Sequence, residues 1–221
     1  MPLPITDKEK IELTNKIFYL FAEHGFDGIS MDEVAKRTKL SKATLYKYFK
    51  SKEDIVRDMV DELISHFDSV KFTTDDSIGG VLDSISVGYF KAVLATASSS
   101  SKFLSDLKNK FPEIYSDYLS ALESVQTRFI AFYKCAAKAG FCKSVSIDIV
   151  VEQIKRTLPA IINSSYLNMH QTSLSVIIKE YYRLLLCQLL SSEYTAVIDQ
   201  DDVYLFADKL VAVMKSKFLI P

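Results

Sequence analysis

Residues 30–52 bring together side chains that can bind a polyanion. Ser41, Thr44 and Tyr46 add hydroxyl groups to this basic stretch. The stretch has a net charge of +5, whereas the rest of the chain carries −6 and the whole chain −1. A basic patch on an acidic chain favours docking of DNA at one place, although the bulk charge predicts no such partner. A solvated, charged helix face is the alternative. The positive charges belong to Lys36, Arg37, Lys39, Lys42, Lys47, Lys50 and Lys52.

Two short helices joined by a tight turn must position these groups. Ser30 and Glu33 form a capping box that predicts the start of the first helix, and Ser41 is a favourable N-cap for the second. Leu45 and Phe49 lie four residues apart, so both fall on one face of the second helix and should pack inward. The pattern is typical of a helix-turn-helix with a recognition helix. The other side of this helix and its flanks carry Lys42, Thr44, Tyr46 and Lys47.

A third helix is expected to begin near Lys52. Ser51 and Asp54 form a second capping pattern at this point. A lysine at a helix start can meet a phosphate that the helix N-terminus already attracts.

This segment resembles the DNA-binding domain of the TetR family of one-component bacterial regulators. The resemblance covers roughly residues 7–55, and the pattern Leu-Tyr-x-Tyr-Phe followed by Ser-Lys-Glu is its most specific part. Ala43 departs from the family, which often has Gly there; alanine favours helix more, so we expect altered contacts and an intact fold. The resembling residues are FAEHGFDGIS at 21–30, MDEVA at 31–35, LSKATLYKYF at 40–49 and SKE at 51–53.

The resemblance implies a role for each matching position. Thr44, Tyr48 and Lys52 would contact phosphates. Lys42, Ala43 and Tyr46 would lie nearest the base edges, with Lys47 on the DNA backbone or a base. Tyr48 could instead cover the small core beside Phe49, and Lys42 could bind guanine O6 or N7 or touch only phosphate. The full expected contact set is Ser41, Lys42, Ala43, Thr44, Tyr46, Lys47, Tyr48 and Lys52.

Composition and periodicity predict an all-α chain. Only 6 Gly and 5 Pro interrupt 221 residues, of which 48% are hydrophobic. We expect a three-helix helix-turn-helix DNA-binding domain over residues 1–52 and a helical ligand-binding and dimerisation domain over 53–221. Besides the two short helices, the predicted helices cover 7–24, 52–67, 78–95, 102–109, 112–138, 147–164 (bent at Pro159), 173–190 and 201–217, about ten in all.

The resemblance also implies a homodimer with a four-helix interface. By order along the chain, we assign that interface to the helices near 147–164 and 173–190. The second of these is apolar almost all round, which indicates burial on two sides. Alternatively, the final helix at 201–217 covers its second side.

An effector site is expected among aromatic residues of the helical domain. An aromatic lining suits a small apolar or planar molecule, although each residue could be ordinary core. A domain that responds to a protein partner is the alternative. The candidate lining residues are Phe67, Tyr89, Phe103, Tyr118, Phe129, Tyr133 and Tyr166.

Other classes of protein are not indicated. The chain has no local signature of a catalytic triad, a phosphate-binding glycine loop or a zinc-protease motif, so we expect no enzyme, cofactor or metal site. The three cysteines are widely spaced, and we expect buried free thiols. No signal pattern opens the chain and no apolar run approaches the length of a membrane span, so we expect a cytoplasmic protein. The implied activity is binding of double-stranded operator DNA, most commonly for repression.

Overall fold

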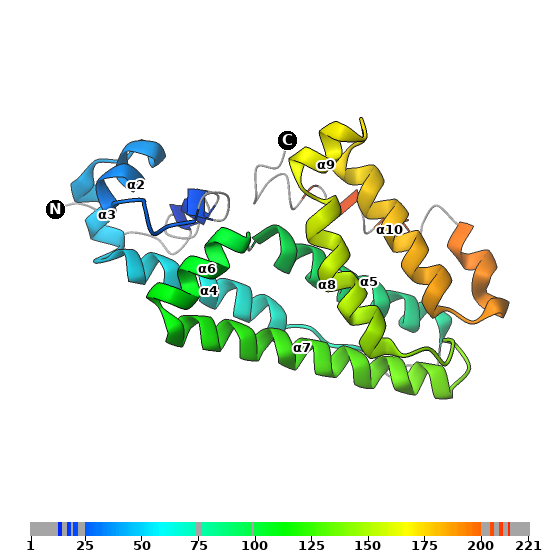
Figure 1. Ribbon diagram of the computed structural model, residues 1–221. Helices are drawn as coiled ribbons and strands as arrows, with labels where there is room; N and C mark the ends of the chain where they lie inside the picture. Colours follow the sequence, from blue (N-terminus) through cyan, green and yellow to red (C-terminus); the bar gives the residue numbers. More distant parts are fainter. Residues whose placement is uncertain are drawn as a thin grey trace. The chain divides into compact units, whose positions relative to one another are not determined.

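The computed structural model is entirely helical over the residues that it describes. These are residues 25–73, 77–98 and 100–199, with positions 13, 14, 17, 18, 20 and 21 before them and 204, 205, 208, 209 and 212 after them. Nine α-helices and one 3-10 helix are formed within this part of the chain (Figure 1). The all-α fold with an N-terminal helix-turn-helix is confirmed, and the described residues form two compact units.

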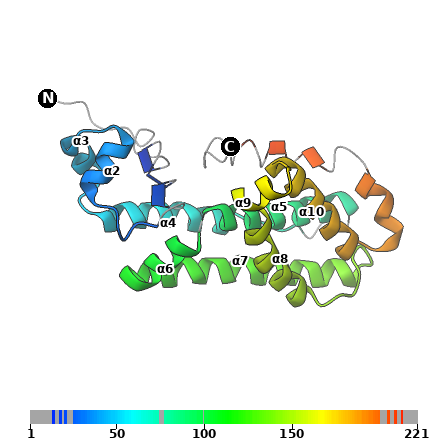
Figure 2. The same cartoon turned by 45° about the horizontal axis from the view of Figure 1, so that its top comes forward.

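The first unit contains the helix-turn-helix and the helices that follow it. It comprises the described residues up to Asp68 together with Ser98–Leu122. Its helices are α2 (Met31–Thr38), α3 (Lys42–Tyr48), α4 (Lys52–Asp68), α6 (Ser101–Lys110) and the start of α7 (Pro112–Lys138). Figure 2 shows α2 and α3 at the N-terminal end of α4. The described positions before residue 25 are helical and supply buried residues such as Ile17 and Phe21 to this core.

The second unit is built on the remaining helices. It comprises Ser69–Ala97 and the described residues from Glu123 onward, apart from the last few residues of the chain. Its helices are α5 (Ile78–Ser98), the rest of α7, α8 (Ile147–Ile161), α9 (Ser164–Met169), α10 (Leu174–Leu189) and the 3-10 helix η1 (Ser192–Asp199). The predicted boundary between residues 52 and 53 stays a prediction.

Most helix ends follow the local signals in the sequence. The helix α7 begins at Pro112, whose missing N–H costs nothing in the first turn, and the chain leaves it through Gly140 at φ +89°. The helix α6 begins after Ser100, whose side chain accepts a hydrogen bond from the Phe103 amide at 3.1 Å.

The region around Pro159 differs from the prediction of one bent helix over 147–164. The helix α8 ends at Ile161, and a separate short helix, α9, follows. Asn163 separates the two: its side chain accepts from the Tyr166 amide at 3.0 Å and donates to the carbonyl oxygens of Pro159 and Ala160 at 3.1 and 2.9 Å. One asparagine therefore ends α8 and starts α9.

The chain after α10 and the cysteines also differ from the expectations. The 3-10 helix η1 was not predicted, and the predicted helix at 201–217 lies mostly outside the described residues. The thiols are free, but only Cys142 is buried, whereas Cys135 and Cys187 are exposed, so the expectation of three buried thiols was wrong. Burial raises the pKa of the Cys142 thiol to about 11.

The expectation that no segment could span a membrane was too strict. By length and composition alone, Ile78–Ala97 in α5 is apolar enough to do so. In the structure this helix contributes the buried side chains of Val81, Ile85, Tyr89 and Val93 to the second unit. That is the behaviour of a core helix, which has the same composition.

A glycine allows close packing between α5 and α7 in the second unit. A Cβ atom at Gly88 would lie 2.8 Å from Cδ2 of the Phe129 ring. Gly79, in the first turn of the same helix, would meet nothing nearer than the Ser77 Oγ at 3.9 Å. The two glycines therefore have different roles.

Replacing Gly88 with alanine should destabilise the protein by about 1–3 kcal/mol, because the added methyl group overpacks the contact with Phe129. The matched control, Gly79→Ala, should be neutral or stabilising by up to about 1 kcal/mol, since alanine favours helix. Thermal unfolding followed by circular dichroism measures both. Equal midpoints for the two variants would contradict close packing at Gly88.

Candidate nucleic-acid interface

The turn between α2 and α3 is set by backbone geometry. Ser30 caps α2 by accepting a hydrogen bond from the Glu33 amide at 3.2 Å. At the other end Lys39 adopts a left-handed φ of 60°, and the Leu40 amide donates to the Ala35 carbonyl at 2.9 Å. This arrangement closes the last turn of α2 and directs the chain into α3.

The helix α3 has one buried side and one exposed side. Leu45 is fully buried and Phe49, at the end of the helix, is 1% exposed. Ser41 caps the helix by accepting from the Thr44 amide at 3.0 Å. Tyr46 is 49% exposed although it is a large aromatic residue. An exposed tyrosine beside lysines on a well-anchored helix is suited to contact with another molecule.

The expected DNA-contact residues lie on and beside this exposed side. Thr44, Tyr48 and Lys52 are half-buried, and the other five are exposed: Ser41, Lys42, Ala43, Tyr46 and Lys47. The half-buried Tyr48 ring lies 6.4 Å from that of Phe49, which is compatible with the alternative that it covers the small core. The structure thus brings the eight residues together on one part of the first unit, and their contacts with DNA remain a proposal.

Lys42 has a partner that sequence reasoning missed. Its ammonium lies 2.5 Å from the Asp32 carboxylate on α2, and both side chains are mostly exposed. The two residues are ten positions apart, so no helix periodicity pairs them. A base or a phosphate that binds Lys42 would therefore compete with Asp32 for this ammonium.

Lys52 also has internal partners. Its ammonium donates to the Phe26 carbonyl at 2.8 Å and to the Asp27 carbonyl at 3.3 Å. The N-terminus of α4 itself is capped reciprocally, because the Asp54 carboxylate accepts from the Ser51 amide at 3.2 Å and the Asp54 amide donates to Ser51 Oγ at 3.1 Å. The predicted phosphate contact of Lys52 would have to share an ammonium that already supports the 26–27 backbone.

Comparisons with known proteins point to one family. Residues 15–59 match the family model described as bacterial regulatory proteins of the tetR family. The biofilm operon icaADBC negative transcriptional regulator IcaR of Staphylococcus epidermidis is 28% identical over 119 residues, which are 53% of this chain and 57% of that protein. The match thus spans little more than half of this curated relative.

Solved structures share the fold over more of the chain. The ketosteroid transcriptional regulator KstR2 of Mycobacterium tuberculosis has a TM-score of 0.59 at 14% identity, covering 85% of this chain and 98% of that one. The TetR family regulator PfmR of Thermus thermophilus has a TM-score of 0.56 at 16% identity, covering 80% and 97%.

The fold and the exposed face of α3 define a helix-turn-helix DNA-binding protein. Residues 15–59 carry the DNA-binding domain of the TetR family of transcriptional regulators. Members of this family are transcription factors and not enzymes. No group of three or more His, Cys, Asp or Glu side chains suited to a metal ion occurs among the described residues.

The seven aromatic residues expected at an effector site are divided between the two units. Phe67, Phe103 and Tyr118 belong to the first, and the rings of Phe67 and Tyr118 lie 6.1 Å apart. The other four, Tyr89, Phe129, Tyr133 and Tyr166, belong to the second. An effector site lined by all seven residues is therefore supported by the sequence pattern alone.

Two of these tyrosines hold the core of the second unit by their hydroxyl groups. Tyr89 donates to the Ile178 carbonyl at 2.9 Å, and Tyr133 donates to the Lys143 carbonyl at 2.7 Å. Burial raises the pKa of both phenols, so each remains a neutral donor at physiological pH.

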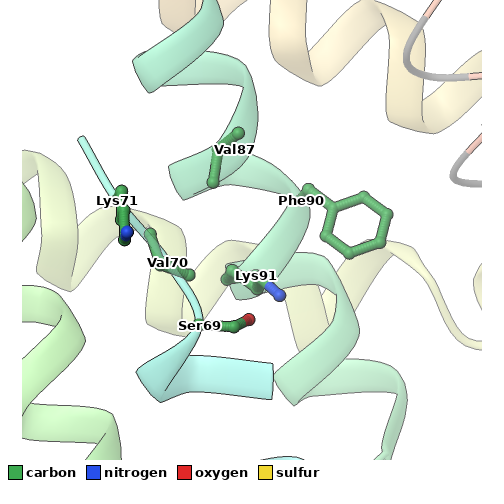
Figure 3. Close-up of a pocket in the computed structure, with 6 residues that line it drawn as sticks. All are labelled: Ser69, Val70, Lys71, Val87, Phe90 and Lys91. Atoms are coloured by element: carbon green, nitrogen blue, oxygen red, sulfur yellow. The ribbon is translucent and has the colours of Figure 1, made fainter. Parts of the chain in front are cut away.

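An opening of about 440 Å³ lies elsewhere in the second unit (Figure 3). It lies between the segment after α4 and the middle of α5, and none of the seven aromatic residues lines it. The Lys91 ammonium lies 5.5 Å from the centroid of the Phe90 ring. Two lysines beside apolar side chains suit an apolar molecule that carries an anionic group. The lining residues are Ser69, Val70, Lys71, Val87, Phe90 and Lys91.

Asp32→Asn should strengthen binding to duplex DNA by about two- to fivefold, because it frees Lys42 and removes a negative charge from the proposed DNA face; exposed ion pairs are worth about 0.2–1 kcal/mol. Titration of labelled duplex by fluorescence anisotropy measures the effect. Asp148→Asn, which removes the same charge from an exposed position on α8, is the control. Unchanged affinity in Asp32→Asn would contradict a restraining role for this ion pair.

Proposed function

We propose that this protein is a ligand-responsive transcriptional repressor that binds a palindromic operator as a homodimer. The observation that carries the proposal is the exposed face of α3, with Lys42, Tyr46 and Lys47 on a helix anchored by Leu45 and Phe49. Family membership supports operator binding and dimerisation. Repression is supported by the relative IcaR, a negative transcriptional regulator. A regulator that acts on an operator works in the cytoplasm.

The proposed dimer uses α8 and α10, which run beside each other in the second unit (Figure 1). The side chains of Gln153 and Gln188 hydrogen-bond to each other and link the two helices. On the same two helices Ile149, Val176 and Leu184 are 69%, 50% and 60% exposed. Three large apolar side chains exposed on adjacent helices support an interface between protein surfaces.

The structure of α10 also bears on the alternative that the chain covers its own second side. Seven residues of this helix are buried, among them Ile178, Tyr181 and Leu185, whereas Val176 and Leu184 are exposed. Asp208 pairs with Lys179 at 2.7 Å and the Tyr204 ring lies 6.5 Å from that of Tyr182, so described residues after η1 reach this helix. The rest of that segment lies outside the described residues.

The proposed effector is a small apolar or aromatic molecule, and the lysines of the opening at 69–71 and 87–91 favour one with an anionic group. Its binding would stabilise a state of the protein with lower operator affinity, and operator binding would weaken effector binding by the same factor. A response to a protein partner is the alternative. It would be favoured if operator binding responds to cell extract protein and to no small-molecule fraction.

Selection from a random duplex library at fixed salt should yield a palindrome with half-sites about 34–36 Å apart, or a multiple of that distance. Binding that ignores sequence would contradict the proposed function.

On the selected operator Lys42→Ala should cost about 1–3 kcal/mol of discrimination at one position per half-site if Lys42 contacts a base. An equal loss on all sequences would instead make Lys42 a phosphate contact.

Leu184→Glu should dissociate the dimer, because it places two charges in a proposed apolar contact. Sedimentation velocity should show monomers, and operator affinity should fall about 100-fold or more because the two helix-turn-helix domains are no longer linked. Ser124→Glu adds the same charge at an exposed position on α7 and should change neither property. A dimeric Leu184→Glu variant would place the interface elsewhere.

A further inference from the structure

A turn at residues 25–27 precedes the helix-turn-helix and has an unusual backbone. Gly25 has a φ of +72°, in the left-handed region that favours glycine, and its amide donates to the Phe21 carbonyl at 2.9 Å. The chain then reverses, so the amides of Phe26 and Asp27 point away from any helical partner. Phe26 is 1% exposed, and buried amides of this kind need an acceptor.

A carboxylate 80 residues away supplies that acceptor. Asp106 Oδ2, on α6, accepts from the Phe26 amide at 2.8 Å and from the Asp27 amide at 3.0 Å. Its other oxygen, Oδ1, pairs with the Lys102 ammonium at 2.6 Å. A Cβ atom at position 25 would collide with the Asp106 carboxylate and with Lys102 Cγ, so the glycine is also needed for this close approach.

The Asp106 side chain is an ionised carboxylate in the folded protein. The Asp106 side chain is 5% exposed, and such burial alone would raise its pKa. The hydrogen bonds from Lys102, Asp27 and Phe26, with the charge of Lys102, outweigh burial, so the pKa lies below its usual value. Hydrogen bonds to a charged acceptor are stronger than neutral ones, which makes this a firm attachment.

The same turn is held from its other side. The Lys52 ammonium on α4 donates to the Phe26 and Asp27 carbonyl oxygens, so the peptide group between Phe26 and Asp27 is bound at both its carbonyl and its amide. The Phe26 ring packs 5.6 Å from the rings of Phe103 and of Phe111. An exposed pair between Asp27 and Lys110 at 3.0 Å adds a weaker link to α6.

We propose that Asp106 is a positioning residue for DNA binding: it fastens the turn before the helix-turn-helix to α6 and so sets the orientation of α3. The proposal rests on the proposed function. The helix-turn-helix, called the head below, has two attachments. The chain continues from it directly into α4, and Asp106 joins the turn before it to α6. The helix α6 is followed at once by α7, which continues into the second unit. A change in the second unit can therefore reach the head through α6 as well as through α4.

A positioning role differs from a purely structural one in what its loss does to operators of altered spacing. A destabilised protein loses active molecules, which lowers affinity for all operators by one factor. A loosened head loses orientation, which lowers affinity for the best spacing but less for operators with one base pair added or removed between half-sites. The ratio of these affinities therefore reports orientation.

The test compares the full-length wild type with Asp106→Ala, which removes the acceptor, and Asp106→Asn, which keeps a carbonyl oxygen but loses the charge. Hydrogen exchange followed by mass spectrometry reads the peptide that contains Phe26 and Asp27. We expect exchange there to rise about tenfold or more in Asp106→Ala and less in Asp106→Asn. The spacing ratio on the selected operator should fall about threefold or more in Asp106→Ala, and less in Asp106→Asn. Asp117→Asn is the control, because this exposed carboxylate pairs with Arg57 at 3.0 Å in the same unit.

Unchanged exchange in Asp106→Ala would overturn the proposal, and so would raised exchange with a wild-type spacing ratio. If Asp106→Ala does not fold, as judged by circular dichroism, Asp106→Asn decides by the same two measurements. Absence of a selected operator for the wild type would refute the proposed function instead. In that case the exchange measurement still decides whether Asp106 fastens the turn.

Discussion

A reversal of the chain at Gly25 is the constraint on which the first unit depends. It lets the described residues before residue 25 and the helix-turn-helix share one small core, but it leaves the buried Phe26 amide and the partly buried Asp27 amide without helical partners. An unsatisfied buried amide is costly, so the Phe26 amide in particular needs an acceptor from elsewhere in the chain. Asp106 is this acceptor and carries a charge, and Lys52 binds the carbonyl oxygens of the same turn. The helix-turn-helix is therefore attached to α4 by the chain and to α6 by this carboxylate.

Local signals predicted the local structure well. The caps of α2 and α3 act over three residues, so Ser30 and Ser41 were sufficient to place both helices, although the Glu33 carboxylate pairs with Arg37. The spacing of Leu45 and Phe49 correctly gave the buried face of α3. Pro112 and Gly140 likewise mark the start and end of α7. The short helix α9 was missed because one residue, Asn163, both ends α8 and starts α9, and Pro159 alone suggested a bend.

The partners of the site residues could not be predicted in this way. Asp32 meets Lys42 across the turn, Lys52 reaches back to residues 26 and 27, and Asp106 lies 80 residues from the amides it binds. Such contacts depend on how helices pack, and neither periodicity nor charge counting records them. Residue type alone was also a poor guide to the effector site. The aromatic residues suggested a lining, whereas Tyr89 and Tyr133 donate their hydroxyl groups to backbone carbonyls of the second unit.

The ion pair between Asp32 and Lys42 has a consequence for how the protein would search DNA. A lysine that meets a phosphate releases a cation bound to the DNA, and this release makes affinity for any sequence fall steeply with salt. Lys42 must weaken its ion pair with Asp32 to make the same contact, so the net gain from a phosphate is smaller than for an unpaired lysine. Sequence-independent contacts then gain little from this lysine, whereas a base edge that offers two acceptors compensates for the lost carboxylate. Lys42 would therefore contribute less to the binding of ordinary DNA than to the binding of a site that offers it a suitable base.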